Sequence, residues 1–261
     1  MAQITLKVLN AAGEVLATST AADEVNLVYA AEYQEGDKFV VEFDEVNTYY
    51  HLQLDDAKGS SLVYVTGNIE FVIPFGEKRK NISPLVFAGE LHYLFARKAY
   101  AEEVNNYRNL ALNVWDQHGE VNCYPHASAN VETRGESTFA ALNAIDNVTA
   151  SESHGMWPYE SWGINRRDDA TWKLEFGRPI DMDKLVVYTR ADFPHDNWWV
   201  EMTVTFSDGT KEVLPLVKGG EPQRFDICKK GITWLEISDL IKTDDPSPFP
   251  ALSQLQVYGR G

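Results

Sequence analysis

The amino-acid sequence predicts an all-β protein made of two β-sandwich domains of the jelly-roll type. Short segments in which apolar and polar residues alternate recur along the chain, and Gly, Asp or Asn separates them, which is typical of sandwiches. The chain has 261 residues, 44% of them hydrophobic, which is enough for one large or two ordinary domains. A polar, Gly-bearing segment at 116–120 marks the boundary, so we predict domains over 1–118 and 119–261.

In the first domain the alternation is clearest at 38–43, where Phe39, Val41 and Phe43 fall on one face of a strand. We expect a single helical turn or an irregular connection at 99–106. Nothing in this half carries a motif that assigns a role. The expected strands cover residues 4–8, 25–33, 38–43, 50–54, 62–66, 69–75, 91–100 and 110–115.

The second domain is organised around residues 171–208. Trp172, Leu174 and Phe176 share one face of the strand expected at 171–177. A turn is expected at 178–181, and the segment 185–188 is apolar on both faces, as in a central strand. The other elements expected are a helical turn at 139–147 and strands at 200–206, 212–216, 224–227, 233–237 and 252–258.

A polar and aromatic loop joins the strands at 185–188 and 200–206. It places Arg190, His195, Asn197 and Trp198 close together in sequence. A sugar has apolar C–H faces and hydroxyl edges, so binding it calls for a flat aromatic side chain and forked hydrogen-bond donors. The alternative is that a Trp of this loop packs in the core and Arg190 makes a surface ion pair. A second long loop, at 151–169, carries further aromatic and basic side chains.

Charge and composition exclude some partners. The net charge of −16 repels phosphate backbones and anionic lipid headgroups, so we expect neither nucleic acid nor a membrane as partner. No leader and no membrane-spanning run is visible, so we expect a cytoplasmic protein, or a secreted one if a leader has been removed. Two cysteines, Cys123 and Cys228, do not make a disulfide framework.

The second domain resembles the discoidin, or coagulation-factor type C, domain, a galactose-binding-like jelly roll to which many bacterial carbohydrate-binding modules belong. The resemblance covers roughly residues 121–259 and lies in the order of its segments. These are NAIDN at 143–147, TWKLEFG at 171–177, ID at 180–181, VYTR at 187–190, FSDGT at 206–210, WLEI at 234–237 and ALSQLQVYG at 251–259.

The resemblance implies a sugar site. Arg190 and Asn197 match the positions whose side chains hydrogen-bond the sugar hydroxyls in galactose-recognising members. A histidine completes such sites, and here either His154 or His195 is available. The expected aromatic platform is Trp198. The other candidates for the platform are Trp157, Trp162 and Phe249.

The resemblance also implies a structural calcium ion. Its ligands would come from Asp146, its neighbour Asn147 and an acidic residue in the last strand. Gln254 stands in the place of that acidic residue. A neutral amide weakens a site for a hard cation that depends on carboxylate charge.

These observations predict a non-catalytic carbohydrate-binding protein whose partner is a galactose-type or related glycan. Two alternatives stay open: a hydrolase with catalytic carboxylates in the first domain or in the cleft between domains, and a protein–protein interaction module. The sequence contains no Gly-rich phosphate loop, no His-Glu-x-x-His metalloprotease motif and no Gly-x-Ser-x-Gly nucleophile motif. No motif specifies an oligomeric state.

Overall fold

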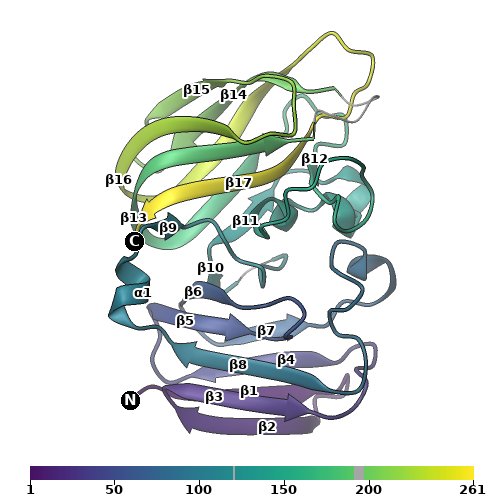
Figure 1. Cartoon of the computed structure of the whole chain (residues 1–261), viewed down its shortest axis with the longest axis vertical. Coiled ribbons are helices and arrows are strands. Elements are labelled where there is room, and N and C mark those ends of the chain that lie inside the picture. Colours follow the sequence, from purple (N-terminus) through teal and green to yellow (C-terminus); the bar gives the residue numbers. More distant parts are fainter. Residues whose placement is uncertain (120, 191–196) are drawn as a thin grey trace.

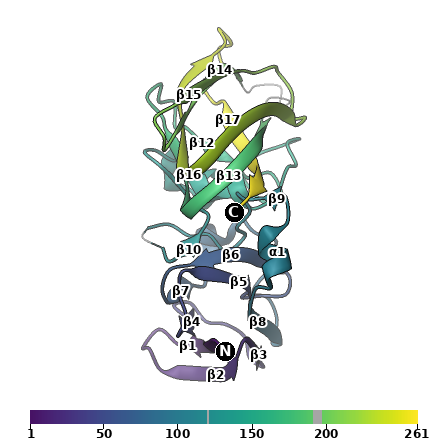
Figure 2. The same cartoon turned by 90° about the vertical axis from the view of Figure 1, so that its left-hand side faces the viewer.

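The computed structural model describes residues 1–119, 121–190 and 197–261. They form two β-rich units stacked end to end, the first at the bottom of Figure 1 and the second at the top. Figure 2 shows the same stacking from the side. Every strand pair assigned in them is antiparallel, and the prediction of an all-β sandwich protein is confirmed.

The first unit is a sandwich of two sheets. Alternate residues of β1 (Gln3–Leu9) are buried, so that Ile4, Leu6 and Val8 have no exposed surface. The aromatic ring of Trp115 closes this core near the second unit. One sheet has the order β2 (Val15–Ala22), β1, β4 (Lys38–Phe43), β7 (Ile69–Val72), and the other β10 (Cys123–Tyr124), β6 (Ser61–Val65), β5 (Thr48–Gln53), β8 (His92–Lys98), β3 (Glu24–Tyr29).

The segment after β8 differs from the prediction. A short helix, α1 (Ala101–Asn105), is followed by β9 (Arg108–Asn109), and the strand expected at 110–115 is absent. The reason is local, because asparagine side chains bind the backbone there in place of a strand partner. Asn109 Oδ1 accepts the N–H of Ala111 at 3.0 Å, and Asn113 Oδ1 accepts the N–H of Trp115 at 3.0 Å.

The second unit is built on one continuous sheet that bends round a core. Trp172, Phe176 and Phe206 lie fully buried in that core. Short β11 (His126–Ala129) pairs with β13, and β9 pairs with β17. The order of the sheet is β12 (Trp162–Gly163), β17 (Ala251–Arg260), β13 (Trp172–Thr189), β16 (Gln223–Lys242), β14 (Trp199–Phe206), β15 (Lys211–Pro215).

The turn predicted at 178–181 is wrong, because β13 continues through it. β13 pairs with β16 on both sides of this point, with an irregular register between Glu175 and Ile180. The bend falls at Gly177, whose φ is +68° and where a Cβ atom would meet the Tyr124 ring at 2.5 Å. The strands expected at 224–227 and 233–237 are likewise two parts of β16. Long bent strands therefore serve both layers of this sandwich.

The short helical elements lie near the contact between the units. The helical turn expected at 139–147 is confirmed as the 3₁₀ helix η4 (Ala141–Ile145). It follows η2 (Thr133–Gly135) and η3 (Ser137–Phe139), and η1 (Gly76–Arg79) belongs to the first unit. None of the helices in the described part of the chain has the length and apolar composition needed to cross a bilayer.

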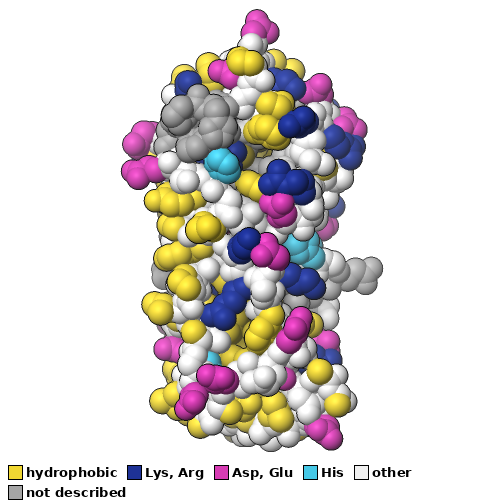
Figure 3. Space-filling view, turned by 90° about the vertical axis from the view of Figure 1, so that its right-hand side faces the viewer, with side chains coloured by type: hydrophobic (Ala, Val, Ile, Leu, Met, Phe, Trp, Pro, Cys, Tyr) yellow, Lys and Arg dark blue, Asp and Glu magenta, His cyan; other side chains and the backbone are white. Residues whose placement is uncertain are grey.

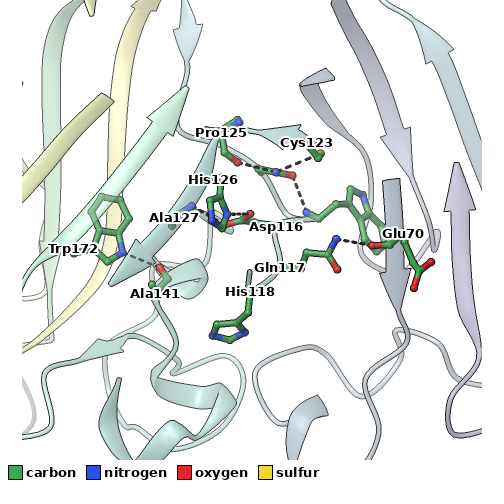
Figure 4. A network of polar contacts seen from close by, with 12 residues as sticks. Glu70, Asp116, Gln117, His118, Cys123, Pro125, His126, Ala127, Ala141 and Trp172 are labelled. Atoms are coloured by element: carbon green, nitrogen blue, oxygen red, sulfur yellow. Dashed lines mark hydrogen bonds and ion pairs between the residues drawn. The ribbon is translucent and has the colours of Figure 1, made fainter. Parts of the chain in front are cut away.

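The chain between the units is tied to both of them, as Figure 4 shows. Asp116 Oδ1 lies 2.7 Å from His126 Nδ1, while Oδ2 accepts the N–H of Ala127 at 2.8 Å. On the other side, Gln117 Nε2 donates to the carbonyl of Glu70 at 2.6 Å. Cys123 packs in the core of the first unit although it lies after residue 118 in the sequence. The chain around residue 118 therefore contributes to both units. The boundary at 118/119 stays a prediction. Both cysteines are free thiols.

Candidate functional site

A pocket of about 120 Å³ opens at one end of the second unit. Three of the residues proposed for sugar binding, Arg190, His154 and Phe249, line it together. Arg190 and Phe249 are far apart in sequence and meet because β13 ends at Thr189 and β17 begins at Ala251, on neighbouring strands of the sheet, while His154 comes from the loop before β12. We call this the Arg190 pocket. Its other lining residues are Thr133, Arg134, Phe139, Gly163, Ile164, Pro250 and Ala251.

Arg190 is held by the wall of the pocket. Its backbone N–H donates to the carbonyl of Ala251 at 3.0 Å, and its side chain is only 4% exposed. Guanidinium nitrogens reach Ser161 Oγ and the carbonyl of Phe249, each at 3.4 Å. These bonds are long, and a guanidinium carries five N–H donors. Arg190 is therefore a buried, charged side chain in the wall of the pocket.

Aromatic rings form the apolar part of the site. Phe249 is half-buried, and the guanidinium of Arg166 lies 4.7 Å from the centre of its ring. Phe139 lies beneath Arg190, with 5.9 Å between the ring centre and the guanidinium carbon. A planar ring beside forked donors is the combination that a sugar ring requires.

The segment 131–139 supplies lining residues that sequence reasoning missed. Arg134 has a φ of +55° and forms a bidentate ion pair with Glu136, at 2.6 and 2.8 Å. This segment packs closely against β12, because a Cβ atom on Gly163 of β12 would lie 2.6 Å from Thr133 Oγ1. The prolines on either side of Phe249 were a signal for a stiff segment, but nothing in the sequence showed that segment 131–139 lies opposite it.

Asn197 and Trp198 lie outside the Arg190 pocket. The Asn197 side chain is fully buried and makes four hydrogen bonds, with the Thr243 and Asp245 carbonyls, the Trp198 N–H and the Thr243 hydroxyl. Its amide therefore fixes the loop at 243–245 and has no group left for a ligand. The Trp198 ring is half-buried, with the ammonium of Lys218 at 4.8 Å from its centre.

Trp162 is not a platform. Its ring is fully buried in the second core, 6.2 Å from the ring of Trp199, and its Nε1 donates to the Val131 carbonyl at 2.9 Å. A buried ring has no free face for a ligand. The remaining histidine candidate, His195, lies outside the described residues.

Trp157 lines a different hollow, between the two units, also of about 120 Å³. Lys58 enters it from the first unit, and Asp146 and Glu160 from the second. We call it the Glu160 hollow. Glu160 is 2% exposed, and its carboxyl shares a hydrogen bond with the carboxyl of Asp146. The hollow thus ends on a buried pair of carboxyl groups.

The charges of the Glu160 hollow influence one another. Burial raises the pKa of Glu160 to about 7, and burial with the nearby Glu160 charge raises the pKa of Asp146 well above its usual value. Burial lowers the pKa of Lys58 to about 8, although the Asp146 and Glu160 charges oppose this shift. The ammonium also lies 5.3 Å from the centre of the Trp115 ring. The cluster joins the two units through charge.

The expected calcium ligands do not form a carboxylate-rich cage. Calcium takes about six to eight oxygen ligands. Within residues 1–119, 121–190 and 197–261, no three His, Cys, Asp or Glu side chains are placed to hold a metal ion. Asp146 Oδ1 accepts the N–H of Val148 at 2.8 Å, and Asn147 is exposed with a φ of +72°. Gln254 is fully buried and its amide has no partner among the described residues. The residues present do not fit the ion, and calcium binding stays a prediction of the resemblance.

Comparison with known proteins returns sugar-binding modules. No family model and no curated protein matches the chain. Chitosan-binding module 1 of a chitosanase/glucanase from Paenibacillus sp. IK-5 is 16% identical, with a TM-score of 0.40 over 58% of this chain and 98% of that one. A Streptococcus pneumoniae fucose-binding module is 14% identical, with a TM-score of 0.39 over 59% of this chain and 98% of that one. The family 32 carbohydrate-binding module of C. perfringens NanJ, solved with galactose, is 14% identical, with a TM-score of 0.38 over 51% of this chain and 91% of that one.

These similar structures are carbohydrate-binding modules.

Proposed function

We propose that this protein binds carbohydrate without cleaving it, through the Arg190 pocket of the second unit. The observation that carries the proposal is that Arg190, His154 and Phe249, separated by long stretches of sequence, line one small pocket. A half-buried ring and a rigid guanidinium share that pocket, so a sugar can place its C–H face on Phe249 and its hydroxyls toward Arg190.

The size of the pocket sets the expected strength of binding. A hollow of about 120 Å³ holds part of one sugar ring and leaves the remainder in solvent. Few contacts give weak binding, so we expect a dissociation constant on the order of millimolar for one monosaccharide, about −4 kcal/mol. Galactose and related sugars are the first candidates, since the resemblance is to galactose-recognising domains.

A glycan array of the purified protein tests this function. We expect the wild type to bind a defined group of sugars, and Phe249→Ala and Arg190→Gln to lose that signal while keeping the wild-type unfolding temperature within a few degrees. Arg167→Gln is the matched control, because Arg167 is exposed and pairs only with Asp169 among the described residues. Absence of glycan binding by the wild type would refute the proposal.

A further inference from the structure

One loop of the second unit lines several hollows in succession. His154 lines the Arg190 pocket, and Gly155 lines a neighbouring hollow of about 240 Å³ with Lys80. Met156 and Trp157 then line an apolar groove that also contains Lys80. Trp157 and Glu160 finally line the Glu160 hollow. Successive hollows share lining residues or are lined by consecutive ones, so they lie one after another along this loop, and we call this series of hollows the track.

The track crosses from the second unit to the first. Its apolar groove has residues of the first unit, among them Ile82 and Pro84, facing Met156 and Trp157 of the second. Met156 is 59% exposed and Trp157 is 38% exposed, so both are open to a ligand. Figure 3 shows the side on which these loops lie, with hydrophobic side chains gathered along its left border and Lys and Arg side chains through its middle.

The far end of the track has the groups that a second sugar ring needs. Trp157 offers a partly exposed indole for a C–H face. Glu160 and Asp146 offer a buried, hydrogen-bonded pair of carboxyl groups whose oxygens can accept from sugar hydroxyls. Lys58 brings an ammonium donor into the same hollow. An aromatic ring, acceptors and a donor therefore converge there, whereas the Arg190 pocket combines aromatic rings with a guanidinium.

We infer that the protein recognises an oligosaccharide chain, with one ring in the Arg190 pocket and a later ring at Trp157 and Glu160. This inference rests on the proposed function and specifies its ligand. An extended chain advances at most about 3.6 Å per residue, so the three steps from His154 to Trp157 span at most about 11 Å. A short oligosaccharide is long enough to follow this stretch of the loop. Both units then contribute to one ligand, which gives the first unit a part in binding.

The test is a glycan array on which each sugar is printed both as a monosaccharide and as oligosaccharides of increasing length. We expect the wild type to bind the longer chains about tenfold more tightly than the monosaccharide, the gain from about 1.4 kcal/mol of additional contact. Trp157→Ala removes that preference for length and leaves monosaccharide binding unchanged. Glu160→Gln, which keeps the size of the side chain, lowers the preference as well.

The control variants separate the two sites. Trp234→Ala removes a half-buried tryptophan on β16, which lines none of the hollows named above, and should bind as the wild type does. Phe249→Ala should weaken monosaccharide and oligosaccharide alike. If Trp157→Ala keeps the wild-type preference for longer chains, or if the wild type has no such preference, oligosaccharide binding along the track is refuted. Sugar binding in the Arg190 pocket is not affected by that result. If the wild type binds no glycan of any length, both proposals fail.

Discussion

The guanidinium of Arg166 lies 4.7 Å from the centre of the Phe249 ring, at the rim of the pocket that Arg190 lines. A guanidinium over an aromatic face is attracted to the ring and restricts its motion. The ring has two faces, so this contact orders Phe249 without using all of its surface. Arg166 is exposed and, among the described residues, makes no ion pair, which leaves this ring as its main partner there.

The first prediction concerns this pair. Phe249→Ala removes the stacking surface and should weaken sugar binding about tenfold, whereas Arg166→Gln only loosens the ring and should weaken it about twofold to threefold. Calorimetric titration with the best glycan from the array measures both. Tyr100→Ala is the control, because Tyr100 is an exposed ring of the first unit with Arg97 at 4.3 Å. Equal losses in all three variants would argue against a specific site.

The second prediction separates a structural role of Asn197 from a binding role. Asn197→Ala removes four hydrogen bonds in a fully buried setting and should lower the free energy of unfolding by about 2–3 kcal/mol. Sugar affinity of the folded fraction should be unchanged. Denaturant unfolding and titration on the same sample measure the two quantities. Lost affinity with unchanged stability would instead support the role that the sequence resemblance implies.

The third prediction concerns calcium. Since the expected ligands do not fit the ion, we expect the unfolding temperature of the wild type to be the same with calcium and with chelator. Gln254→Glu restores a carboxylate in the last strand and should make the unfolding temperature rise by several degrees on addition of calcium. Gln256→Glu, two residues along β17, is the control. A wild type that loses stability in chelator would show that Gln254 suffices as a ligand.

The fourth prediction is a pH dependence of stability. Burial raises the pKa of Glu160 from 4.5 to about 7, so the folded protein holds this proton more tightly than the unfolded chain does. The stabilisation is complete below pH 4.5 and is lost as the pH rises to about 7, with a total on the order of 3 kcal/mol. Denaturant unfolding across this range should show a smaller decline in Glu160→Gln than in the wild type, since the raised pKa of Asp146 contributes to the decline as well.

Glu136→Gln serves as the comparison for that pH series. Arg134 lowers the pKa of Glu136, so Glu136 is already ionised throughout the window in which Glu160 titrates. This variant should follow the wild type there. A decline of equal size in the wild type and in Glu160→Gln would assign it to another group.

The alternation of side chains was enough to predict most strands and the sandwich class, because period 2 is a local property of each strand. It was not enough to show that β13 continues through residues 178–181, since that path depends on the bend at Gly177 against Tyr124. For the site, Arg190, His154 and Phe249 were named from the sequence and the structure brings them together. Asn197 and Trp162 were named as well, but their burial depends on contacts between distant segments, which no local pattern encodes.

The pairing of β9 with β17 decides where a stable fragment containing the second unit can begin. Arg108 and Asn109 cover the edge of the last strand, Asn109 Oδ1 accepts the N–H of Val257 at 3.0 Å, and Leu110 and Ala111 fill the second core. A fragment that starts at residue 119 would leave that edge open to pairing with another chain, an aggregation hazard. A fragment that starts before residue 107 keeps it closed. The second unit therefore includes a strand, β9, that precedes the expected boundary at 118/119 in the sequence.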